Sequence, residues 1–275
     1  MGRDRVVYTA IFDDYDVLTD PEEPSPGIDY LCFTDAADVE SEVWTPVVVE
    51  SEDLSPAELN RAVKILPHEF LPSYDASLYV DGNVKIRCDV ARLFDDYLVD
   101  RAMVLPPHPN RNCVYEEANA CIEAGKGDPE VINDQMRRYR RRGFPEGDGL
   151  PENSMLLRRH HAPAVKKTME TWWEEFRRGS NRDQLSFAYA AWETGFDYRL
   201  LPTPIIESDC FVRYPHRPQD WRDPLWKYWV HVVIHRYDAI PYTACYYACV
   251  LLSVVSRDGP TEALRRTADF VRKRV

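Results

Sequence analysis

Asp81, Gly82 and Asn83 are three consecutive residues whose types could hold a divalent cation. They follow the apolar run 76–80, which is typical of a buried strand. A carboxylate oxygen and an amide oxygen two positions apart suit Mg²⁺ or Mn²⁺ carrying a diphosphate, because such an ion takes a few protein oxygens and leaves the rest to phosphate and water. Gly82 lets a ligand approach the backbone closely. The same tripeptide is also ideal for a plain β-turn, so these residues alone leave both interpretations open.

The segments around this tripeptide alternate between strands and helices. Apolar, β-rich runs at 6–12, 29–35 and 44–50 predict three strands, and acidic residues stand at or just after the ends of the first two. The stretch 55–66 begins with Ser-Pro-Ala-Glu, a capping signal, and predicts a helix that ends before a proline. We therefore expect an α/β fold in which a mostly parallel central sheet is flanked by helices.

Composition limits what the chain can bind and where it works. Its 275 residues, 44% hydrophobic and 29% charged, suffice for one large domain or a domain with an appendage. A net charge of −12 argues against a general nucleic-acid binder. The seven cysteines include no Cys-x-x-Cys pair, so we expect small core residues and no disulfide framework. The N-terminus has no secretory apolar region, which leads us to expect a reducing cytoplasm.

The chain changes character after about residue 204. The stretch 239–256 carries no charge but contains a proline and several Tyr and Thr residues, so its length and polarity are marginal for a membrane span. A basic amphipathic helix is expected at 265–274. We expect a buried or interfacial helix at 239–256 rather than a span. Its role as a lid, a homo-oligomer surface or a peripheral contact with the inner face of the membrane stays open.

A set of short motifs in a fixed order connects these segments. They lie at residues 7–12, 15–16, 29–35, 64, 67–68, 77–83, 115–118, 149–153, 158–160 and 182–187. Their order and spacing resemble the glycosyltransferase-like family that includes the plant mucilage-related pectin galacturonosyltransferase, the turgor-regulation protein of pollen tubes and many bacterial members. The resemblance implies a GT-A-like nucleotide-diphospho-sugar transferase domain at 1–204, followed by a C-terminal helical extension at 205–275.

The resemblance also implies transfer of a sugar from a nucleoside-diphosphate sugar, expected to be a UDP-sugar, to a glycan or polysaccharide acceptor. Negative charge builds up on the leaving diphosphate, and Mn²⁺ or Mg²⁺ and fixed cations stabilise it. Asp81, Asn83 and His216 are the expected metal ligands, with Asn83 standing where the family's usual Asp-x-Asp pattern has its second acid. The residues expected to bind the donor are Thr9, Tyr15, Asp16, Asp35, Arg61, Lys64, Asp81, Gly82, Asn83 and Gln184.

Asp183 and Asp81 are the expected catalytic residues. Asp183 would hold hydroxyls of the donor sugar, or act as base toward the acceptor in an inverting reaction. The plain alternative for Asp183 is electrostatic stabilisation of a helix start. The residues expected to contact the sugar or the acceptor are Glu152, Asn153, Arg158, His160 and Arg182.

Two other functions stay open. One is a metal-dependent hydrolase that cleaves an amide, as a ceramidase does, with a metal-bound water near Asp81. Such an enzyme is expected to use zinc with histidine ligands, and the sequence presents no clear set of these. The other is a non-catalytic module that binds a sugar or a nucleotide without turnover.

Overall fold

The structure, a computed structural model, describes residues 3–216, 229–233, 235–236, 239–261, 264–265 and 267–268. The chain divides into two compact units, Met1–Val212 and Arg213–Val275. The sequence predicts a boundary at residue 204. The first unit extends beyond that residue because Ile205 and Phe211 are buried in its core.

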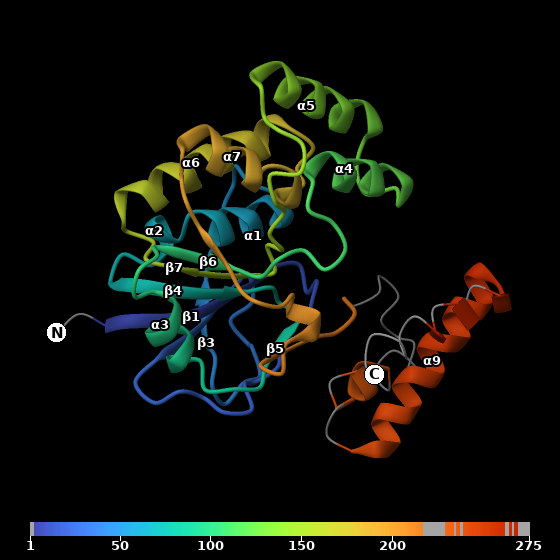
Figure 1. Ribbon diagram of the computed structural model, residues 1–275. Helices are drawn as coiled ribbons and strands as arrows, with labels where there is room; N and C mark the ends of the chain where they lie inside the picture. The colour runs from blue at the N-terminus through green and yellow to red at the C-terminus, as the bar shows by residue number, and fades with distance from the viewer. Residues whose placement is uncertain are drawn as a thin grey trace. The chain divides into compact units, whose positions relative to one another are not determined.

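A seven-stranded sheet forms the centre of the first unit (Figure 1). Its strand order is β3-β2-β1-β4-β7-β6-β8, and β7 is the strand that runs antiparallel to its neighbours. The prediction of a mostly parallel sheet is therefore confirmed. The strands are β1 (Arg3–Ile11), β2 (Asp29–Thr34), β3 (Thr45–Val48), β4 (Tyr74–Val80), β6 (Met103–Leu105), β7 (Met155–Arg158) and β8 (Arg199–Leu200).

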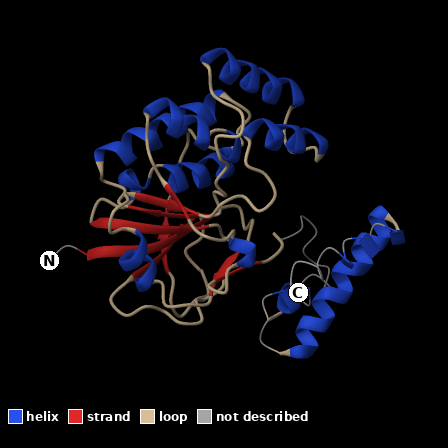
Figure 2. Cartoon of the chain, in the orientation of Figure 1, coloured by secondary structure: helices blue, strands red, loops and turns tan. Residues whose placement is uncertain are grey.

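Helices cover both faces of this sheet, as Figure 2 shows. One face carries α1 (Pro56–Ile65), α2 (Pro67–Phe70), α6 (Pro163–Arg178) and α7 (Phe187–Thr194), and the other carries α3 (Ala91–Tyr97). Alternate residues of each strand serve the two cores, so Tyr8 packs with the α1 side and Val7 with the α3 side. A third apolar cluster joins α4 (Val114–Glu123), α5 (Pro129–Arg142) and α7.

The capping signal at Ser55 begins α1 as predicted. Ser55 Oγ accepts a hydrogen bond from the Glu58 amide, and the Glu58 carboxylate accepts one from the Ser55 amide. The two bonds satisfy amides that have no partner within a helix, so the sequence determines where α1 starts.

A small second sheet pairs β5 (Val84–Ile86) with β9 (Phe211–Arg213). A disulfide joins Cys88 to Cys210 just outside these strands, across a sequence separation of 122 residues. The expectation that the cysteines form no disulfide is therefore wrong for this pair. Spacing along the chain gives no sign of it, because the pairing of β5 with β9 is what brings the two residues together. Cys32, Cys113 and Cys121 are buried free thiols, as predicted.

The second unit contains α9 (Ile240–Asp258), in the segment where the sequence predicts an apolar helix. The Tyr246 ring stacks on Trp229, with centroids 5.8 Å apart, beside a small cluster of Tyr214, Val230 and Val233. Within the described residues, no helix has both the length and the apolar character needed to cross a membrane. Most of the predicted basic helix at 265–274 lies outside the described residues.

Candidate active site

Lys64 lies between two carboxylates at one edge of the central sheet. Its ammonium nitrogen is 3.0 Å from Asp81 Oδ1 and 2.6 Å from Asp183 Oδ2. Lys64 is in the last turn of α1, Asp81 directly follows β4, and Asp183 begins the short 3₁₀ turn η1 (Asp183–Leu185). Three segments far apart in the sequence thus place one cation between two anions where parallel strands end, the usual place for a ligand in such sheets.

Hydrogen bonds to the sheet hold α1 in this position. Asn60 Nδ2 donates to the Ala10 carbonyl at 2.6 Å, which ties the helix to the end of β1. The Lys64 carbonyl accepts hydrogen bonds from the Arg158 guanidinium at 2.8 Å and from the Tyr8 hydroxyl at 3.3 Å. Because Arg158 and Tyr8 are fully buried, the last turn of α1 and the Lys64 side chain are fixed relative to the sheet.

Arg158 and His160 therefore serve the scaffold, and the prediction that they contact the sugar or the acceptor does not fit this structure. Neither is exposed to solvent. His160 Nδ1 lies 3.0 Å from Ser77 Oγ and its Nε2 lies 3.2 Å from the Leu71 carbonyl. Burial, followed by the nearby Arg158 charge, lowers the pKa of His160 to about 4, so the imidazole is neutral at pH 7.

Asp183 is an ionised carboxylate with fixed partners. Burial alone would raise its pKa, but the positive charges of Lys64 and Arg61 outweigh burial and hold the pKa well below the usual range. Arg61 Nε lies 3.6 Å from Asp183 Oδ1. The Asp183 carbonyl accepts hydrogen bonds from Trp172 Nε1 at 3.1 Å and Asn153 Nδ2 at 3.2 Å. A carboxylate held this way accepts hydrogen bonds from hydroxyls well but accepts a proton poorly.

Asp81 uses one of its oxygens for the cluster. Oδ1 accepts hydrogen bonds from Lys64 and from the Tyr79 hydroxyl, the latter at 3.1 Å. Burial, and then the negative charge of Asp81, raise the pKa of Tyr79 well above its usual value, so Tyr79 remains a donor. The Asp81 side chain is still 28% exposed. It is thus the most accessible member of the Lys64 pairs, since the Asp183 side chain is 10% exposed and that of Lys64 is 2% exposed.

Gly82 is required by close packing. A Cβ atom at this position would stand 2.8 Å from Ile11 Cγ1 and 3.0 Å from Asp16 Oδ2. The absent side chain lets Asp16 pack directly against the backbone next to Asp81. Asp16 was predicted to meet the nucleotide, and the structure places it close to Gly82 in the tripeptide predicted to bind a metal.

The other predicted donor contacts differ in accessibility. Thr9 is buried two residues before the end of β1, so its predicted contact with the nucleotide does not fit. Tyr15 is 58% exposed in the loop after β1. Asp35 Oδ2 accepts a hydrogen bond from the Asp13 amide at 2.8 Å, which joins the loops that follow β1 and β2. Two neighbouring strands thus present Tyr15 and Asp35 at the same sheet edge as Asp81.

Gln184 and Asn153 connect the loop before β7 to η1. Gln184 Nε2 donates to the Pro151 carbonyl at 2.5 Å, and its Oε1 accepts from the Asn153 amide at 3.3 Å. Glu152 Oε1 accepts from Ser154 Oγ at 3.1 Å in the same loop. Arg182 is half-buried, immediately before Asp183. These residues set the position of Asp183, and their direct contact with a ligand stays a prediction.

The predicted metal ligands differ in their burial. Asn83 is 3% exposed beside Asp81, whereas His216 is an exposed residue of the second unit and stays a prediction. Among the described residues, no three His, Cys, Asp or Glu side chains form a group that could hold a metal ion. Asp81 directly precedes Gly82 in the chain, and Asp16 packs close to Gly82. An ion that takes most of its ligands from phosphate and water needs few protein oxygens, so the metal site at Asp81 and Asn83 stays a prediction.

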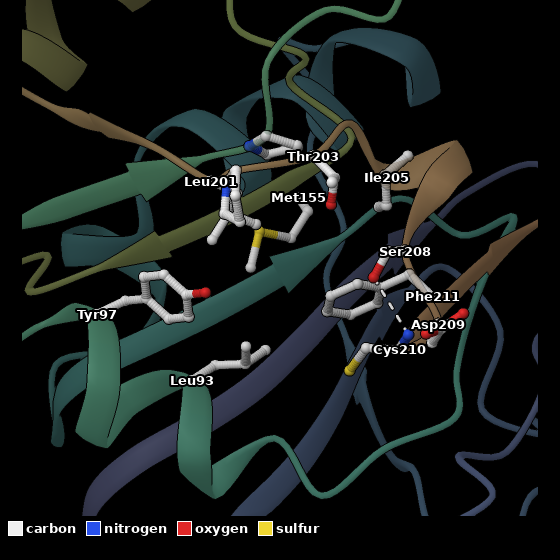
Figure 3. Close-up of a pocket in the computed structure, with 12 residues that line it drawn as sticks. Leu93, Tyr97, Met155, Leu201, Thr203, Ile205, Ser208, Asp209, Cys210 and Phe211 are labelled. Atoms are coloured by element: carbon white, nitrogen blue, oxygen red, sulfur yellow. Dashed lines mark hydrogen bonds between the residues drawn. The ribbon is translucent and has the colours of Figure 1, made fainter. Parts of the chain in front are cut away.

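Sequence reasoning missed Tyr79 and Asn60, which hold Asp81 and α1 in place. The contact between Tyr79 and Asp81 could have been predicted, since residues two apart along a strand point to the same face. It also missed a cavity of about 250 Å³ on the α3 side of the sheet (Figure 3). Its lining includes Tyr97, Met155 and Phe211, and Ser208 Oγ accepts a hydrogen bond from the Cys210 amide beside it. These residues come from distant segments, so no local sequence pattern predicts the cavity.

Comparison with known proteins adds two findings from sequence. The family model described as the TOD1/MUCI70 glycosyltransferase-like domain matches residues 2–201. A curated relative, the probable hexosyltransferase MUCI70 of Arabidopsis thaliana, is 28% identical over 211 residues, covering 66% of this chain and 36% of that protein. The chain therefore spans about a third of the length of this relative.

Three solved structures are similar at low sequence identity. The WbbM bifunctional glycosyltransferase has a TM-score of 0.45 and 8% identity, covering 73% of this chain and 39% of that one. Mouse xyloside xylosyltransferase 1 has a TM-score of 0.41 and 10% identity, covering 73% and 85% of the two chains. The galactosyltransferase LgtC has a TM-score of 0.41 and 14% identity, covering 70% and 72%.

Proposed function

Because the chain belongs to the TOD1/MUCI70 glycosyltransferase-like family, we propose that its first unit transfers a hexosyl or uronosyl group from a nucleoside-diphosphate sugar to a glycan or polysaccharide acceptor. A UDP-sugar is the proposed donor. The observation that carries the proposal is the buried Lys64 between Asp81 and Asp183 at the edge where the parallel strands end.

The charges of this cluster explain why a cation would be needed. Lys64 and Arg61 contribute two positive charges, and Asp81 and Asp183 contribute two negative ones, so the formal sum is zero. A cluster with no net charge gives little electrostatic stabilisation to the negative charge of a leaving diphosphate. Mn²⁺ or Mg²⁺ at Asp81 and Asn83 would supply the missing positive charge as a Lewis acid.

The chain's own residues then have separate roles in binding the donor. Asp183 keeps Lys64 in place and accepts hydrogen bonds from hydroxyls of the donor sugar, a role that suits its low pKa better than that of general base. Lys64 and Arg61 face the region where the diphosphate departs. Tyr15 and Asp35, on the loops after β1 and β2, bind the base and the ribose of the nucleotide.

The first test is nucleotide binding by the full chain. Thermal unfolding would be followed with UDP, GDP and CMP, each with and without Mn²⁺. We expect UDP with Mn²⁺ to raise the melting temperature most, through binding to the folded state. Asp81→Asn should remove the Mn²⁺-dependent part of this shift. Asp75→Asn is the matched control, since Asp75 is an exposed residue of β4, the strand that Asp81 follows.

The second test is turnover, measured as UDP release from UDP-sugars with glycan acceptors present. Nucleotide binding without release would favour the non-catalytic module. Amide hydrolysis that needs zinc and no nucleotide would favour the hydrolase. Absence of any nucleotide response would remove the main support for a transferase.

A further inference from the structure

The exposed residues of α9 form a continuous apolar face. Burial is described for helix residues 240–252, 254 and 255, and every exposed one among them is apolar. At 100° per residue they fall within an arc of about 140°. This α9 stripe consists of Ile240, Pro241, Ala244, Cys245, Ala248, Leu251, Leu252 and Val255.

The α9 stripe is separate from the face that packs inside the second unit. Val254 is 8% exposed, and Tyr246 stacks on Trp229 and also lies under the Arg236 guanidinium. By contrast, Ile240 is 84% exposed and Leu252 is 66% exposed. A helix on the surface of a soluble unit normally turns polar side chains to water. The composition of this helix therefore calls for an apolar environment on its outer side.

The charge of the second unit indicates which environment that is. Residues 213–275 hold 11 Lys and Arg against six Asp and Glu, a net charge of +5, whereas residues 1–212 carry −17. Six of those basic residues follow the uncharged part of the helix, at 257, 265, 266 and 272–274. An apolar face joined to a basic segment matches an anionic lipid surface. A second copy would instead bring two positively charged units together.

We propose that the α9 stripe binds the surface of an anionic lipid bilayer, with the helix lying in the plane of the interface. A helix of 19 residues is about 28 Å long. Lying flat, it would insert Ile240, Leu251 and Leu252 at the boundary between headgroups and acyl chains while the second unit covers its other face. The proposal does not depend on the reaction proposed for the first unit.

Vesicle flotation of the full chain tests this proposal. The probes are phosphatidylcholine vesicles with and without phosphatidylglycerol. The stripe variant is Leu251→Asp with Leu252→Asp. The matched control is Val99→Asp with Ile206→Asp, which removes two exposed apolar residues of the first unit and adds the same charge. We expect the wild type and the control to float with phosphatidylglycerol vesicles, and the stripe variant to bind roughly tenfold or more weakly.

Four results would overturn the proposal. The first is no flotation of the wild type. The second is an equal loss of vesicle binding in the stripe variant and the control, because the loss would then come from the change in net charge alone. The third is a dimer in light scattering that the wild type and the control form and the stripe variant does not, which would assign the stripe to contact with a second copy. The fourth is a melting temperature that, without vesicles, falls for the stripe variant and not for the control, because the stripe would then be covered by the chain itself.

Discussion

Lys64 Nζ lies 2.6 Å from Asp183 Oδ2, with the lysine side chain 2% exposed and the aspartate side chain 10% exposed. This pair joins the last turn of α1 to η1, two segments that the sequence alone does not connect. Removing one member of such a pair leaves a charge without its counterpart in a region of low dielectric. The pair therefore stabilises the fold and also holds the Lys64 ammonium group in position beside Asp81.

Asp183→Asn should destabilise the protein by about 3 kcal/mol, because Lys64 then loses its nearest counter-charge. Urea unfolding measures the change. Asp197→Asn is the control, since the Asp197 side chain is 77% exposed and lies 3.5 Å from Arg101, a pair expected to contribute under about 1 kcal/mol. Equal stability of the two variants would contradict a structural role for the Lys64–Asp183 pair.

The effect of Asp183 should also depend on pH. Its folded-state pKa is lowered, so its stabilising contribution is complete above its unfolded value of about 3.9 and disappears as the pH falls through the folded value. The stability difference between wild type and Asp183→Asn should thus be constant near neutral pH and shrink below about pH 4. A difference that persists undiminished at lower pH would mean that packing, not charge, is responsible.

His160 should make the protein sensitive to mild acid. The unfolded chain takes up its proton near pH 6.5, whereas burial lowers the folded pKa to about 4. Stability should therefore fall by up to about 3 kcal/mol as the pH falls from 6.5 to 4. His160→Gln should flatten this part of the stability profile, and His161→Gln, at an exposed neighbour whose charge contributes less than burial to the lowered pKa of His160, should change it much less. A wild-type profile that is already flat would show that His160 titrates normally.

Gly82→Ala should disturb the loop that carries Asp81. The new methyl group would meet Ile11 Cγ1 at 2.8 Å and Asp16 Oδ2 at 3.0 Å, so either the loop or its neighbours must move. We expect a loss of about 1–3 kcal/mol and a weaker response to UDP with Mn²⁺. Adding Ile11→Ala should restore part of that response by making room for the methyl group. No change in nucleotide response for the single variant would show that the packing around Gly82 is not needed for binding.

The disulfide should stabilise the folded chain. Cys88–Cys210 closes a long loop, so Cys88→Ser with Cys210→Ser should cost about 2–4 kcal/mol in unfolding experiments under oxidising conditions. Cys245→Ser, at an exposed free thiol, is the control. Thiol titration of the unfolded wild type should give five free groups if the bond is present. Seven free groups would show that the pair is reduced in the protein as prepared.

Local sequence signals determined the main elements. The Ser55 capping box begins α1 because capping bonds involve only residues within one turn. The β-rich runs predicted β1, β2 and β3, since burial on a strand needs only apolar side chains at suitable spacing. Acidic residues after these strands, together with the ordered motifs, also identified the family and the sheet edge that holds Asp81.

Only the tertiary structure decided which charges meet and which residues are hidden. Lys64 stood among the residues expected to bind the donor, and only the packing of η1 beside α1 identifies Asp183 as its partner. Arg158, His160 and Thr9 matched the motifs yet lie in the core. The Cys88–Cys210 bond depends on the pairing of β5 with β9. Burial and partner choice depend on how distant segments pack, whereas helix capping and hydrophobic periodicity act within a few residues.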